Sequence, residues 1–130
     1  MRRVLALTFV LAARAHASPA VEIHTSCAAE LAEHERTLRA ELERSLAGAA
    51  PRARLTLDVT LERLVETAAR GELEVVAEVR VLVSDSHGAM RWSSKSRAMV
   101  RGAPRSRARL RRDAVIEATR TLVATIRARL

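Results

Sequence analysis

Arginines crowd together near the end of the chain, and they are the residues best suited to chemistry in this sequence. Residues 105–112 (RSRARLRR) contain five of them, namely Arg105, Arg107, Arg109, Arg111 and Arg112. A guanidinium presents a planar fork of donors that matches the oxygens of phosphate, sulfate or carboxylate groups. The run falls where a helix is expected to begin, and the helix dipole disfavours cations at that end. The run therefore predicts a surface that binds an anionic partner.

The same basic character extends into the strand that is expected before this helix. Its outward side chains include Arg91, Lys95, Arg97 and Arg101. Together with the arginine run, these residues form the candidate anion- or partner-binding site. The alternative interpretation is a solvated basic face, because the whole chain is skewed towards arginine, with 22 arginines against one lysine.

Aromatic side chains, which nucleic-acid and sugar sites use for stacking, are almost missing. Phe9 and Trp92 are the two aromatic residues of the chain, and strand alternation turns Trp92 inward. Proteins that bind single-stranded nucleic acid stack the bases on exposed aromatic rings. The sequence therefore disfavours a nucleic-acid partner and favours an anionic polymer, a glycolipid or an acidic protein.

His24, Cys27 and His34 are the residues whose types suit a zinc or copper site. If a helix reached back to His24, then His24 and Cys27 would lie three residues apart on one helix face. His34 lies ten residues beyond His24. That spacing is about 15 Å along a helix axis, too far to complete the site. The simpler interpretation is a small buried cysteine beside two histidines, and we expect no metal and no other cofactor.

Asp85, Ser86 and His87 are neighbours whose types suit acid–base or nucleophilic catalysis. Catalytic sets converge from different elements on a concave site, whereas these three residues share one expected turn. Asp is a frequent turn former because its carboxylate accepts hydrogen bonds from the nearby backbone. Ser94 and Ser96 are expected on the inner sheet face, where hydroxyls usually bond to the backbone or to water. We therefore expect no catalytic residue.

Residues 1–17 are typical of a secretory signal peptide. The basic pair Arg2-Arg3 precedes an apolar run at residues 4–13, and an A-x-A site predicts cleavage between Ala17 and Ser18. Residues 18–130 are then expected to form a single domain in the periplasm or outside the cell. The alternatives are an arginine-rich organellar transit peptide and a twin-arginine signal, which would need more than the bare Arg2-Arg3 pair.

We expect neither a membrane span nor a lipid anchor. The apolar run of ten residues rises about 15 Å as a helix, half of a hydrocarbon core of about 30 Å. Cys27 is not placed as a lipoprotein cysteine, because His24 stands where a lipobox has an apolar residue. The mature chain is therefore expected to be free in solution.

Two amphipathic helices are expected, at residues 27–46 and from about residue 106 to the C-terminus. The first has an apolar stripe about 100° wide, formed by Cys27, Leu31, Leu38, Leu42 and Leu46. The second has an inner stripe of Val115, Ala118, Leu122, Ile126 and Leu130. The segment before the first helix, residues 21–25, alternates with period two and is either a short edge strand or an extra helical turn.

Three strands with period-two alternation follow, at residues 55–61, 73–83 and 90–101. Short connections at 67–71 and 84–88 imply that neighbouring strands pair antiparallel. A few apolar residues remain among the charges of the outer face, either as scattered surface residues or as the centre of a partner site. They are Val76, Leu82 and Met99.

Matching the inward faces gives a register for the second hairpin. Val83 is then expected opposite Met90, and Val81 opposite Trp92. The outer side gains two pairs of opposite charge, Glu78–Lys95 and Glu72–Arg101. These pairs support the register because charge was not used to choose it.

The order helix, strand, strand, strand, helix predicts a two-layer α+β domain. Its sheet has three antiparallel strands, and the N-terminal and C-terminal helices pack on one face. This element order is similar to that of small α/β modules of bacterial envelope proteins, which serve assembly or partner docking, although no motif carries the likeness. We therefore expect an exported, non-catalytic binding or assembly module. The alternatives are a small secreted enzyme and a nucleic-acid or lipid binder held by charge alone.

The charge is unevenly distributed along the chain. Residues 22–85 carry 8 basic and 13 acidic groups, whereas residues 91–130 carry 12 basic and 2 acidic groups. The net charges of the two segments are therefore −5 and +10. Such polarity is compatible with self-association through opposite halves and with an anionic partner that contacts the basic C-terminal half.

Overall fold

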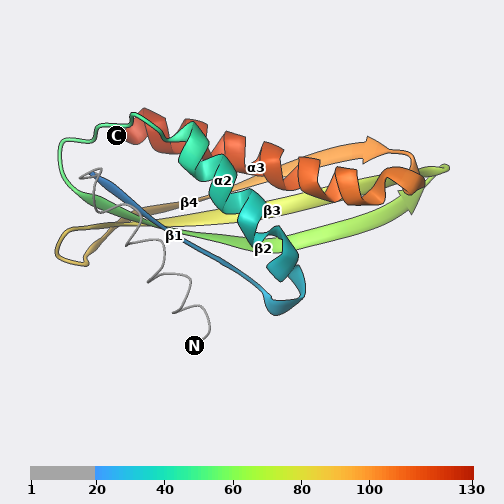
Figure 1. The fold of residues 1–130 in the computed structure, drawn as a ribbon, viewed down its shortest axis with the longest axis horizontal. Helices are drawn as coiled ribbons and strands as arrows, with labels where there is room; N and C mark the ends of the chain where they lie inside the picture. The colour runs from blue at the N-terminus through green and yellow to red at the C-terminus, as the bar shows by residue number, and fades with distance from the viewer. Residues whose placement is uncertain (1–19) are drawn as a thin grey trace.

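The computed structural model describes residues 20–130, so the predicted signal peptide and its cleavage between Ala17 and Ser18 lie outside the described residues. Two layers form the structure, a four-stranded sheet with two α-helices on the same face (Figure 1). The elements in chain order are β1 (Val21–Cys27), the 3-10 helix η2 (Ala29–His34), α2 (Glu35–Ser45), β2 (Leu55–Ala69), β3 (Glu72–Asp85), β4 (Met90–Gly102), the 3-10 helix η3 (Pro104–Ser106) and α3 (Arg107–Arg129).

The predicted α+β class is confirmed, but the prediction of three antiparallel strands is wrong. The sheet has four strands in the order β1-β2-β3-β4, and β1 pairs parallel with β2. The pairing runs from Val21 opposite Leu55 to Cys27 opposite Leu61. Parallel strands need a crossover connection, which η2 and α2 provide. The ambiguous segment 21–25 is therefore an edge strand, and its partner lies 34 residues further along the chain.

The two predicted helices are present with different starting points. Cys27 ends β1, and the first helix begins only after η2, at Glu35. Its predicted leucines are nevertheless buried, because η2 and α2 continue one apolar stripe through Leu31, Leu38, Leu42 and Leu46. The second helix begins at Arg107, one residue after its predicted start at about 106. The inner stripe of α3 is buried as expected, with Val115, Ala118, Leu122 and Ile126 inaccessible to solvent.

The predicted register of the β3–β4 hairpin is wrong by two residues. Val83 lies opposite Trp92 rather than Met90, because a bulge leaves Arg91 unpaired beside the turn. The charged residues shift with it, so that Glu78 faces Arg97 and Glu74 faces Arg101. A slip of two residues keeps side chains on their own faces, so the predicted faces of β4 are right from Trp92 onwards although the predicted partners are wrong. The inward face predicted for Met90 is wrong, because Met90 lies before the bulge, pairs with Ser84 and is 61% exposed.

A second bulge, in β2, determines which side chains face the helices. The register shifts between Leu61 and Arg63, so Glu62 is the extra residue. Beyond the bulge, Glu66 lies opposite the buried Val75 and therefore on the helical side of the sheet. The strand extends to Ala69, well past its predicted end at residue 61. A two-residue turn with positive φ angles, typical of a type I′ hairpin, follows at residues 70–71.

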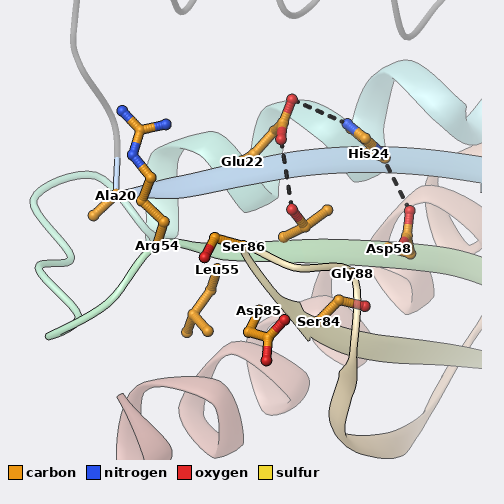
Figure 2. Close-up of a pocket in the computed structure, with 11 residues that line it drawn as sticks. Ala20, Glu22, His24, Arg54, Leu55, Asp58, Ser84, Asp85, Ser86 and Gly88 are labelled. Atoms are coloured by element: carbon orange, nitrogen blue, oxygen red, sulfur yellow. Dashed lines mark hydrogen bonds and ion pairs between the residues drawn. The ribbon is translucent and has the colours of Figure 1, made fainter.

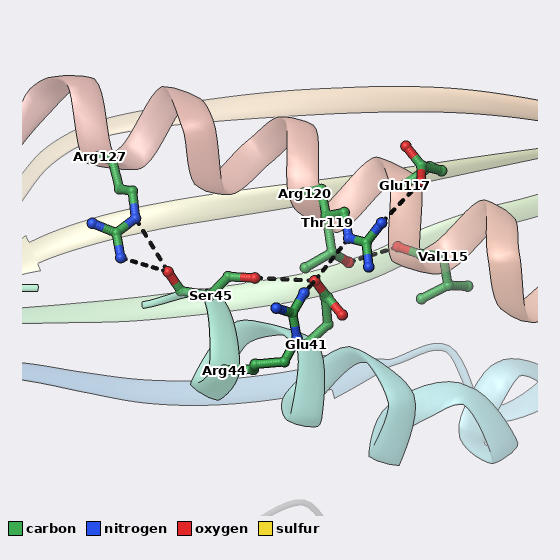
Figure 3. A network of polar contacts seen from close by, with 8 residues as sticks. All are labelled: Glu41, Arg44, Ser45, Val115, Glu117, Thr119, Arg120 and Arg127. Carbon is green, nitrogen blue, oxygen red and sulfur yellow. Dashed lines mark hydrogen bonds and ion pairs between the residues drawn. The ribbon is translucent and has the colours of Figure 1, made fainter. Parts of the chain in front are cut away.

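The two helices are tied to each other by a polar network centred on the buried Glu41 (Figure 3). Its Oε2 accepts hydrogen bonds from Arg120 Nε of α3 (3.1 Å), Ser45 Oγ (3.0 Å) and Arg44. Burial raises the pKa of Glu41, but the bonds from Arg120, Arg44 and Ser45 outweigh it, and the net pKa is lowered. Arg127 of α3 also donates to the Ser45 carbonyl oxygen at 2.7 Å. The network fixes the C-terminal turn of α2 against α3.

Candidate anion-binding site

The N-terminal end of α3 has no acidic group of its own. Ser106 is the N-cap, its side chain makes no capping hydrogen bond, and the first turn contains no acidic residue. A helix begins with backbone N–H groups that lack partners within the helix, and its dipole favours negative charge there. The sequence places five arginines at this end instead. The structure divides them into two groups with different surroundings.

Arg107 and Arg111 form the first group, which is bound within the molecule. Arg107 Nη2 lies 2.6 Å from Glu66 Oε1, and Arg111 Nη1 lies 2.5 Å from Glu66 Oε2. The Glu66 side chain is only 15% exposed. The hydrogen bond from Arg107 lowers the pKa of Glu66 most, and the bond from Arg111 lowers it further, so together they outweigh the effect of burial. Glu66 therefore stays ionised beneath the start of α3 and neutralises part of the arginine run.

His34 lies beside this pair, where η2 meets α2. Its Nε2 is 3.1 Å from Glu33 Oε2 and 3.4 Å from Arg111 Nη2. Burial, and then the charge of Arg111, lower the pKa of His34, so its imidazole is neutral at pH 7. The space between η2, α2 and the start of α3 is an open cleft of about 380 Å³. The cleft is lined by Glu33, His34, Thr37, Arg107, Ala108, Arg111 and Arg112.

Arg105, Arg109 and Arg112 form the second group, which faces solvent. All three are exposed, and none has an ion pair or hydrogen bond with any residue of the described range 20–130. Arg109 and Arg112 are three positions apart on α3, so their like charges are neighbours on the helix surface. We call this group the free arginine cluster, and its full charge is exposed to solvent.

Three of the four basic residues of β4, in contrast, are paired with glutamates across the outer sheet face. Lys95 Nζ lies 3.4 Å from Glu62 Oε1. Arg97 Nε lies 3.7 Å from a Glu78 oxygen, and Arg101 Nε lies 2.9 Å from a Glu74 oxygen. Such exposed pairs stabilise little, but they cancel charge. Lys95, Arg97 and Arg101 thus differ from the free arginine cluster in having acidic partners within the molecule. Arg91 lies at the other end of β4, away from both groups.

The predicted outer apolar patch is only partly assembled. Val76 and Met99 lie opposite each other on β3 and β4, and Val65 of β2 completes the row. Leu82 lies six residues from Val76 along the same strand, which corresponds to about 20 Å. Val65 was missed from the sequence because it follows the bulge, beyond the predicted end of its strand.

The residues considered for a metal site do not come together in the structure. His24 and Cys27 belong to a strand, where residues three apart point to opposite faces, so the helical chelating pair does not form. His24 instead lies between Glu22 and Asp58, with nitrogen–oxygen distances of 3.4 and 3.3 Å, in a cleft of about 410 Å³ (Figure 2). Within residues 20–130, no three His, Cys, Asp or Glu side chains form a group suited to a metal ion.

Two of the other polar candidates, Asp85 and Ser96, bond to the backbone, as their patterns predicted. Asp85 Oδ1 accepts from the backbone N–H groups of His87 and Ala89, at 2.9 and 3.0 Å. Ser96 Oγ donates to the carbonyl oxygen of Ala118 on α3. In the described range, no helix has both the length and the apolar character needed to cross a bilayer.

Comparison with known proteins gives similarity of fold. No protein-family model and no curated protein matches the chain. A putative lipoprotein from Caulobacter crescentus is 19% identical, with a TM-score of 0.56, over 84% of this chain and 89% of that one. A minor lipoprotein from Acinetobacter baumannii is 13% identical, with a TM-score of 0.61, over 84% and 91%. Rare lipoprotein B from Shewanella oneidensis is 15% identical, with a TM-score of 0.51, over 82% and 94%.

Proposed function

We propose that the chain is an exported, non-catalytic binding module of the bacterial envelope, and that the free arginine cluster at the start of α3 contacts an anionic partner. The predicted signal peptide supports export to the periplasm or beyond. The three similar folds are those of lipoproteins, which supports an envelope setting. Fold similarity alone carries no residue role, so the assignment of the site depends on the arginines themselves.

The observation that carries the proposal is the contrast between two sets of three basic residues. Lys95, Arg97 and Arg101 each have a glutamate partner on the outer sheet face. The three arginines of the free cluster have none within residues 20–130. The helix dipole opposes cations at the start of α3, where Arg105 and Arg109 lie, and the like charges of Arg109 and Arg112 repel each other as neighbours on the helix. An external anion would relieve both costs, and the guanidinium forks suit its oxygens.

The cluster favours a partner with several oxyanion groups on one surface. A phosphorylated glycolipid, an acidic polysaccharide and an acidic protein surface all meet that description. The shallow, open cleft beside the cluster suits contact with a surface better than enclosure of a small substrate. We therefore favour a docking role over the alternative of a small secreted enzyme.

Retention on heparin, a sulfated polysaccharide, tests the proposal with a matched control. The variant R105Q/R109Q/R112Q and the variant K95Q/R97Q/R101Q each lose three positive charges. If the proposal is right, the helix variant elutes at clearly lower salt than the wild-type chain, whereas the strand variant elutes close to it. Equal shifts in both variants would show that only net charge matters, and retention that survives high salt would exclude a charge-based contact.

A further inference from the structure

A second group of arginines converges at the opposite end of α3. There the C-terminal end of α3, the loop between α2 and β2, and the β3–β4 turn lie at the same end of the molecule (Figure 1). The end of α3, the loop and the first residues of β2 and β4 line a cleft of about 210 Å³. The lining residues are Pro51, Arg52, Ala53, Leu55, Arg91, Trp92, Arg129 and Leu130. Its three arginines come from distant parts of the chain, and no lining side chain is acidic.

Trp92 holds one of these arginines in place. The guanidinium carbon of Arg129 lies 4.7 Å from the centroid of the indole ring, a cation–π contact. Trp92 is partly buried and packs against the hydrophobic core, so the ring is a fixed platform. Stacking leaves the edge of a guanidinium free to donate hydrogen bonds in the plane of the group.

The other two arginines are exposed and also lack an acidic partner. No salt bridge joins Arg52 or Arg91 to any residue of the range 20–130. The positive charge of Arg91 lowers the pKa of Asp85, but this is the smallest of the effects on that carboxyl group. The Asp85 carboxylate is already engaged by backbone N–H groups of its own turn. The β4 bulge leaves Arg91 outside the regular strand pairing, at the rim of the cleft.

We propose that this cleft binds a phosphate group through Arg52, Arg91 and Arg129. A tetrahedral oxyanion accepts hydrogen bonds from several directions and carries up to two negative charges, which suits three separate guanidinium groups better than a single carboxylate does. The group is either free inorganic phosphate or a phosphate of a lipid headgroup. The walls supply a small apolar surface through Pro51, Ala53 and Leu55, where the remainder of a phosphorylated molecule has room to lie.

This cleft is independent of the free arginine cluster. Arg112 of the cluster and Arg129 of the cleft are 17 positions apart on α3, which corresponds to about 26 Å at 1.5 Å per residue. One phosphate group cannot span that distance. Loss of one site therefore leaves the other intact.

Tryptophan fluorescence reads this cleft directly, because Trp92 is the one tryptophan of the chain and there is no tyrosine. Inorganic phosphate, then vesicles of phosphatidylcholine with or without phosphatidylglycerol, are titrated into the full mature chain at constant ionic strength. A phosphate group that contacts Arg129 changes the stacking, so the emission changes and saturates. Saturation by inorganic phosphate assigns a free phosphate, and saturation only by the phosphatidylglycerol vesicles assigns a lipid headgroup.

Two double variants give the matched comparison. R52Q/R91Q removes two charges from the cleft, whereas R36Q/R70Q removes two exposed arginines that belong to neither proposed site. We expect the midpoint to rise at least tenfold in R52Q/R91Q and to stay within twofold in R36Q/R70Q. The R105Q/R109Q/R112Q variant should keep the Trp92 response. Failure of the proposed function at the free arginine cluster is therefore distinguishable from failure of phosphate binding in this cleft. No saturable change with either probe, or equal midpoints in both double variants, overturns the proposal.

Discussion

Glu66 is expected to stabilise the protein and, at the same time, to hold two arginines at the start of α3, where we propose that an anion binds. It is the shared partner of Arg107 and Arg111, and it is 15% exposed. The substitution Glu66→Gln keeps the size of the side chain and removes its charge. Two cations then lose their counter-ion beneath the helix.

The expected loss of stability comes mainly from Arg111. Its side chain is only 20% exposed, whereas that of Arg107 is 64% exposed, so water screens the Arg107 pair. A hydrogen bond to a charged group contributes about 1.5–3 kcal/mol, and Gln retains part of it as a neutral acceptor. We therefore expect the free energy of unfolding at pH 7 to fall by roughly 1–2 kcal/mol in E66Q.

Urea denaturation followed by far-UV circular dichroism measures this change. The pKa of Glu66 is lowered from 4.5 in the folded protein, so its contribution is present above about pH 4.5 and disappears as the pH falls through the lowered value. The difference between wild type and E66Q should therefore shrink in acid. E66Q should also elute from heparin at higher salt, because Arg107 and Arg111 become available to the ligand.

The control is Glu74→Gln, which removes a glutamate paired with the exposed Arg101. We expect it to cost less than about 1 kcal/mol. A loss in E66Q no larger than that in E74Q, or a loss that persists unchanged at pH 3, would refute the reasoning about Glu66.

Three further predictions concern a thiol, an imidazole and the strand register. Burial, and then the charge of Glu35, raise the pKa of Cys27 to about 11 from 9.0, so its thiolate at pH 8 is about 100-fold scarcer than in the unfolded chain. Ellman's reagent should therefore label the native protein far more slowly than the urea-unfolded protein, and equal rates would contradict the burial. The pKa of His34 is lowered from 6.5 by burial and by Arg111, so the unfolded state takes up the proton first as the pH falls below about 6.5. Urea denaturation should show that the wild type loses more stability than H34Q between pH 7.5 and 5.5, and parallel curves would contradict this. A double-mutant cycle should give a coupling of about 0.2–1 kcal/mol between Glu74 and Arg101 and none between Glu72 and Arg101, and the reverse result would restore the register expected from the sequence.

Period-two alternation identified the faces of the predicted strands, except at Met90 beside the β4 bulge, but could not identify the partners. Val83 and Trp92 both point to the core in either register, because the slip is two residues. The register is determined by the bulge at Arg91 and by the tight turn in which Asp85 accepts a backbone hydrogen bond. Both are local features of the backbone conformation. Alternation of hydrophobicity carries no information about them.

The parallel edge strand and the burial of Glu66 depend on contacts between distant residues. Val21 pairs with Leu55, and Glu66 reaches Arg111 across 45 residues. A seven-residue edge strand has too few residues to reveal its direction from its own pattern. Glu66 appears in the sequence as one more surface acid, and only the β2 bulge turns it towards the helices.

The sequence identified the basic residues of the candidate site but not which of them have acidic partners within the molecule. All nine basic residues lie where they can contact solvent, yet Lys95, Arg97, Arg101, Arg107 and Arg111 have acidic partners within the molecule. Charge counts along the sequence could not separate them from the free arginine cluster. Arg52 and Arg129, which join Arg91 around Trp92, were missed because they are far apart in sequence and lie in no basic run.

The central claim is that an anion binds at the free arginine cluster and leaves the paired bases of β4 undisturbed. Resolved side-chain Nε–Hε signals of arginine in an NMR titration with a heparin tetrasaccharide test it most directly. We predict that the signals of Arg105, Arg109 and Arg112 shift together with one saturable midpoint, while those of Arg97 and Arg101 stay in place. Shifts of Arg97 and Arg101 at the same or lower ligand concentration would contradict the claim.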